Sequence, residues 1–175
     1  MNVDRALGWL QATDVAITIS ENEIIFPWIE SVHVLAIVLV VGTISIVDLR
    51  LLGVASLDRP VRRLMADVLP FTWGAFAIAA TTGSLMFSSD AVHYSHNFFF
   101  RGKLVLLALA GLNMAVFHLV SIGDIERWDA SGQTPAAARA AAAVSLLIWI
   151  SVVVFGRGDR SAGAACRQRG RGRPQ

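Results

Sequence analysis

The sequence predicts an all-α integral membrane protein, a four-helix bundle. The 175-residue chain is 55% hydrophobic and only 16% charged, and its mean hydropathy is +0.59. This composition is too apolar for an ordinary soluble domain of that length. Cutting the sequence at its charged residues also leaves four long uncharged runs, at 31–47, 68–89, 104–123 and 140–156.

The segment before the first run predicts a short additional helix. Ala6, Leu7 and Leu10 lie close together on a helical wheel, beside Trp9. Such a helix either lies along the lipid–water interface or packs against the bundle.

Each uncharged run is long enough to cross the hydrocarbon core, which needs about 20 residues. Backbone groups in lipid must be hydrogen-bonded internally, so the runs are expected to be helices. Residues 1–157 then form a single membrane domain, and 158–175 form a basic, Arg/Gly-rich disordered tail. We expect the four spans at about 26–50, 67–89, 100–122 and 136–156.

The distribution of basic residues predicts the orientation. The connections 48–67 and 124–139 hold six arginines, whereas the opposite side holds Arg5, Arg101 and Lys103. The positive-inside rule then places both termini on the outer side of the membrane. Counting the six arginines of the tail reverses this result. We rely on the connections because early spans usually dominate orientation.

Several classes of function are disfavoured. The basic isoelectric point of about 9.3 comes largely from a tail that follows a membrane helix, so the expected partner is the lipid bilayer and not nucleic acid. Other membrane subunits or a second copy of the chain are further candidate partners.

The single cysteine, Cys166, cannot form an intrachain disulfide or thiolate cluster. No phosphate-binding loop or nucleophile elbow is present, so we expect a non-catalytic protein.

The first span carries three ionisable residues on one face, Glu30, His33 and Asp48. Such groups at membrane depth normally face the bundle interior. One interpretation is a ligand or proton site near one membrane face. The alternative is that Glu30 and Asp48 lie at the interfaces while His33 makes one interhelical hydrogen bond.

The third span contributes His118, which makes His33 and His118 candidate ligands of haem b. The two histidines are not expected to share one iron. The first and third spans run in the same direction, which separates the two side chains by roughly 18–20 Å along the bundle. We therefore expect two separate sites near opposite membrane faces.

A second hypothesis is a metal site formed by His33, His93, His96 and Glu30, which lie on one side of the membrane. The His-x-x-His spacing in a connection is weak evidence for metal binding, and a solvated connection is the alternative. Asp48, Arg50, Lys103 and Asn113 are expected inside the bundle. The embedded polar groups are expected to find partners either among the other ionisable side chains or among the hydroxyls of Thr72, Thr81, Thr82 and Ser145.

Several motifs together resemble a family of small uncharacterised bacterial inner-membrane proteins, catalogued as a domain of unknown function. The likeness covers about residues 10–157 and lies in the segments 26–35, 41–43, 48–53, 69–73, 100–103 and 109–118. It implies a multi-pass, four-helix protein of the bacterial cytoplasmic (inner) membrane. It also implies polar motif positions at Glu30, His33, Asp48, Arg50, Lys103, Asn113 and His118.

A histidine that opens the first span before small residues is also similar to copper-resistance membrane domains and b-type cytochrome membrane subunits. The leading hypothesis is therefore an accessory or anchor subunit, linked to haem or electron transfer through His33. The alternative is a small transporter or metal-handling membrane protein.

Overall fold

The computed structural model of the protein describes residues 3–55, 59–121, 125, 129 and 134–171, with side chains for all of these except 118, 120, 121 and 157–171. The described residues form seven helices and no strands. These are α1 (Val3–Gln11), α2 (Asp14–Glu21), α3 (Ile25–Leu51), α4 (Val61–Ser89), α5 (Ala91–His96), α6 (Phe98–Ser121) and α8 (Ala136–Arg171).

Four of these helices, α3, α4, α6 and α8, are long and apolar enough to cross a membrane. The predicted all-α fold with four spanning helices is therefore confirmed. Large apolar side chains such as Trp28, Leu35, Phe71 and Leu147 are exposed on the outside of the bundle. In a membrane protein this exposed apolar surface faces lipid.

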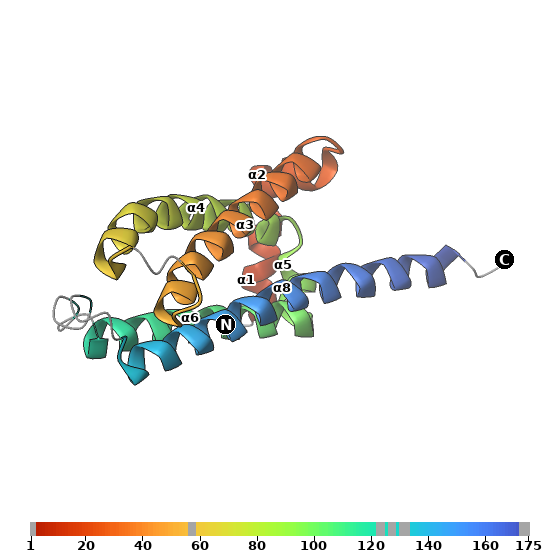
Figure 1. The fold of residues 1–175 in the computed structure, drawn as a ribbon. Coiled ribbons are helices and arrows are strands. Elements are labelled where there is room, and N and C mark those ends of the chain that lie inside the picture. The colour runs from red at the N-terminus through yellow and green to blue at the C-terminus, as the bar shows by residue number, and fades with distance from the viewer. Residues whose placement is uncertain (1–2, 56–58, 122–124, 126–128, 130–133, 172–175) are drawn as a thin grey trace.

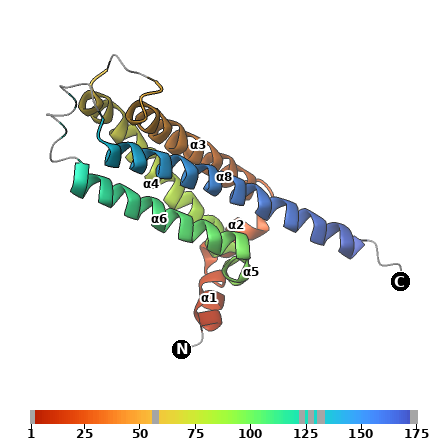
Figure 2. The ribbon, with the colours of Figure 1, turned by 60° about the horizontal axis from the view of Figure 1, so that its bottom comes forward.

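The bundle consists of two packed helix pairs. α3 packs against α4, α6 packs against α8, and contacts between α3 and α8 join the two pairs (Figures 1 and 2). One apolar cluster lies where α3 ends and α4 begins, and includes Leu51, Val61 and Phe117. A second cluster includes Val40 and Trp149. α3 therefore occupies the central position, between α4 and α8.

The start of α4 differs from the prediction, since the helix begins at Val61 and not near residue 67. The reason is a contact distant in sequence. The carboxylate of Asp129 accepts hydrogen bonds from the backbone N–H groups of Val61, at 2.9 Å, and Arg62, at 3.2 Å. A carboxylate in this position satisfies backbone donors that have no partner within the helix and complements the helix dipole.

The N-terminal segment forms α1 and α2 at one end of the bundle. α1 contacts α5 and α4 and projects away from the long helices (Figure 2). The side chain of Gln11 donates to Asp90 at 3.1 Å, so of the two alternatives for this helix, contact with the bundle is present. Trp9 remains 74% exposed.

α8 continues as a helix to Arg171, whereas the sequence predicted a disordered tail from residue 158. Composition gives a physical reason. Alanine and arginine, which have high helix propensity, make up about half of residues 157–171.

Candidate functional site

His33 of α3 is held by the facing helix α4. Its Nδ1 atom lies 2.9 Å from the hydroxyl oxygen of Thr82. That hydroxyl donates to the backbone carbonyl of Ile78 at 2.7 Å, so its oxygen accepts the hydrogen bond from Nδ1–H of His33. This hydrogen bond favours the neutral tautomer that carries its proton on Nδ1 and leaves the lone pair on Nε2.

The close approach of His33 to α4 depends on Gly83. A Cβ atom placed on Gly83 would lie 2.9 Å from Cε1 of His33 and 3.5 Å from Nδ1. Any larger residue would force the ring to move. Gly83 thus provides the surface of α4 against which the imidazole packs.

Two charged residues accompany His33 at this end of the bundle. Glu30 lies one helical turn before His33 on α3, and Lys103 comes from α6; both are half-buried, and both act electrostatically on the imidazole. We call Glu30, His33, Thr82 and Lys103 the His33 cluster. Groups from three spanning helices therefore act on one histidine.

The other two histidines on this side do not join the His33 cluster. His93 and His96 lie on α5 and are exposed. The ring of His93 packs against Tyr94, and Nε2 of His96 lies 3.2 Å from Oδ1 of Asp4. Within the described residues, no three His, Cys, Asp or Glu side chains are grouped so that they could hold a metal ion.

A second polar region lies at the opposite end of α3. Asp48 is only 6% exposed; its carboxyl group accepts a hydrogen bond from Ser145 of α8, and its Oδ2 atom has no hydrogen-bond partner among the described residues. Arg50, also buried, donates through Nε to the carbonyl of Arg59 at 2.8 Å. Its Nη2 atom lies 3.9 Å from Asp129.

The remaining predicted residues lie on α6. The side-chain amide of Asn113 donates to the backbone carbonyl of Ala141 on α8 at 3.0 Å, and so uses a carbonyl where we expected a hydroxyl or an ionisable group. His118 belongs to α6, but its side chain lies outside the described residues. Thr82 and Ser145, by contrast, are two of the hydroxyls that the sequence suggested as partners.

Sequence reasoning missed Thr43 and Asp129. The hydroxyl of Thr43 accepts a hydrogen bond from that of Thr72 at 2.9 Å, which joins α4 to α3. Asp129 caps α4 and pairs with Arg50. The only signal for these two residues was their type, because each contact joins residues that are distant in sequence. For the same reason the sequence does not show that Gly83 lies against His33.

The fold and the polar side chains inside it define a four-helix integral membrane protein. Residues 9–160 match the family described as "Family of unknown function (DUF6644)". Since this match covers most of the chain, the protein belongs to that family. No curated protein and no solved structure matches it.

The contact between Gly83 and His33 predicts that adding one methyl group at position 83 destabilises the protein. Gly83→Ala should displace the imidazole and break its hydrogen bond to Thr82, at a cost of about 1–2 kcal/mol in the free energy of unfolding. Denaturation in detergent, followed by circular dichroism, measures this change. Gly74→Ala on the same helix is the control, because a Cβ there meets nothing within 4 Å. Equal stability of the two variants would contradict the predicted packing.

Proposed function

We propose that this integral membrane protein is a non-catalytic accessory or anchor subunit, and that His33 supplies one ligand to a haem b iron. The observation that carries the proposal is the orientation of the imidazole. Histidines that ligate metals typically donate their other ring N–H to an oxygen acceptor, which sets the tautomer and the ring orientation. His33 has this arrangement, with Nδ1 bonded to Thr82 and the lone pair on Nε2.

The same geometry supports a subunit role. Among side chains described near His33, Glu30 and Lys103 are charged, and the exposed His96 is paired with Asp4. In this proposal a second axial histidine for the same iron comes from another polypeptide. In this proposal His118 serves a separate site near the other membrane face.

The alternative function, a small transporter or metal-handling protein, draws support from a different residue. Buried carboxyl groups within spanning helices commonly mark ion or proton pathways. Asp48 is such a group, and its Oδ2 atom lacks a partner among the described residues. The two functions differ in cofactor content, so one spectrum separates them.

Visible absorption tests the haem proposal. Detergent-purified protein from haem-replete cells should show a Soret band whose position shifts on reduction with dithionite. His33→Ala should lose this band, because the iron loses its ligand. His96→Ala is the control. It removes an exposed histidine at the same end of the bundle, and this variant should keep the Soret band. A wild-type protein without the band, or a band that persists in His33→Ala, would refute the proposal.

We also propose that the protein resides in the bacterial inner membrane with both termini in the periplasm. The arginines that precede and begin α4 support this orientation, since Arg59, Arg62 and Arg63 follow Arg50 within a short stretch of sequence. α4 would then run from the cytoplasmic face outward, and the His33 cluster would lie toward the periplasm.

Cysteine labelling tests this orientation. A cysteine introduced at Ser56 in a Cys166→Ser background should resist a membrane-impermeant maleimide in intact spheroplasts, because the connection between α3 and α4 is cytoplasmic. The same cysteine should react once the membrane is permeabilised, which is the control for its reactivity. Labelling in intact spheroplasts would reverse the orientation.

A further inference from the structure

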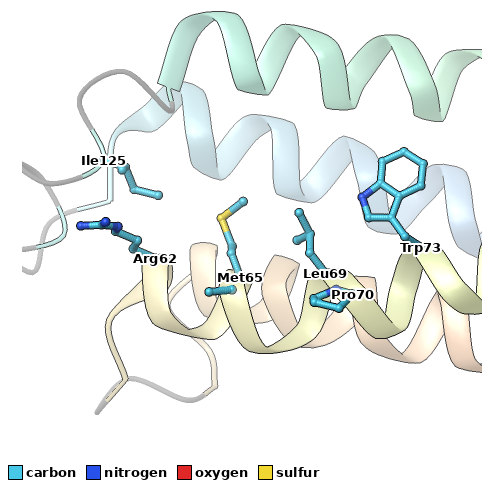
Figure 3. A pocket seen from close by; sticks show the side chains of 7 residues that line it. Arg62, Met65, Leu69, Pro70, Trp73 and Ile125 are labelled. Atoms are coloured by element: carbon cyan, nitrogen blue, oxygen red, sulfur yellow. The ribbon is translucent and has the colours of Figure 1, made fainter.

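A groove with a volume of about 450 Å³ follows the first part of α4. Its size lies within the range of small-molecule sites in proteins. Figure 3 shows its side chains between α4 and the neighbouring helices, with Arg62 at one end and Trp73 at the other. The lining residues are Arg62, Met65, Ala66, Leu69, Pro70, Trp73 and Ile125.

The groove exists because α4 packs mainly on one neighbour. α4 contacts α3 extensively, whereas no comparable packing joins it to α6 among the described helices. Pro70 contributes to the shape, since proline inside a helix removes a backbone hydrogen bond and bends the helix. Figure 1 shows α4 as a curved helix. The side of α4 that faces α6 is therefore left open.

The chemistry of the groove changes along its length. Arg62 lies in the first turn of α4, next to the connection between α3 and α4 and hence near the membrane surface. The other lining residues are apolar, and Met65 and Trp73 extend along the groove wall (Figure 3). A cation at the interface followed by an apolar channel is complementary to an anionic headgroup followed by an acyl chain.

The length of the groove distinguishes a lipid from a helix. Arg62 and Trp73 are separated by about 16 Å along an ideal helix, which is roughly half of the ~30 Å hydrocarbon core. A lipid lies within one leaflet of the bilayer, so its acyl chain needs a groove of about this length. A partner transmembrane helix would instead need an open face along all of α4, which continues to Ser89.

We propose that this groove is a binding site for one anionic phospholipid, whose phosphate pairs with Arg62 and whose acyl chain lies along Met65, Leu69 and Trp73. The site lies at the end of α4 away from Thr82 and the His33 cluster. It is independent of the proposed haem function, so either proposal can fail without the other.

Native mass spectrometry of the full chain in detergent tests the site. Phosphatidylglycerol and phosphatidylcholine with identical acyl chains are the two probes. The wild-type protein should retain one phosphatidylglycerol more strongly than phosphatidylcholine. Arg62→Gln should weaken phosphatidylglycerol binding roughly fivefold, which corresponds to about 1 kcal/mol for one basic residue at an anionic lipid surface. Arg63→Gln, the exposed neighbour outside the groove, should bind as the wild type does.

A second variant tests the apolar part of the groove. Leu69→Trp should fill the channel and weaken the retention of both lipids, while circular dichroism checks that the helices remain folded. Equal binding of both lipids to the wild type, or equal losses in Arg62→Gln and Arg63→Gln, would overturn the proposal. So would a wild-type dimer in detergent that Leu69→Trp converts to monomers, because the groove would then hold a helix of a second copy.

Discussion

Hydrogen bonds between spanning helices determine how this bundle is arranged, because a polar group buried in apolar surroundings costs about 1–3 kcal/mol when it has no partner. His33 and Thr43 of α3 meet Thr82 and Thr72 of α4. On α3, Thr43 follows His33 by ten residues. On α4 the order of the partners is reversed, because Thr72 precedes Thr82 by ten residues. Both contacts therefore fit one antiparallel register of α3 and α4.

The same constraint gives the two ends of the bundle different chemistry. Toward the end that carries α1 and α5, half-buried polar groups from three helices act on a histidine that is hydrogen-bonded to α4. Toward the other end, a buried carboxyl group bonds to α8, and Arg50 connects α3 to the residue that caps α4. α3 takes part in both regions because it lies between α4 and α8.

The sequence predicts the spanning helices well because uncharged runs of sufficient length have few other structures available in lipid. It also places Glu30, His33 and Asp48 on one helix, and the hydroxyls of Thr82 and Ser145 among the candidate partners. It does not predict the start of α4, since the cap comes from Asp129, far along the chain. Nor does it predict that Gly83 seats the imidazole, because that contact depends on how two helices approach each other.

Disulfide cross-linking in the native membrane tests the register of α3 and α4 most directly. Thr43→Cys with Thr72→Cys, in a Cys166→Ser background, should form an intramolecular disulfide on mild oxidation. The two hydroxyl oxygens are 2.9 Å apart, and disulfides form between side chains this close. Thr43→Cys with Phe76→Cys, one turn further along α4, should remain reduced. Cross-linking of the second pair in preference to the first would contradict the register on which the His33 cluster depends.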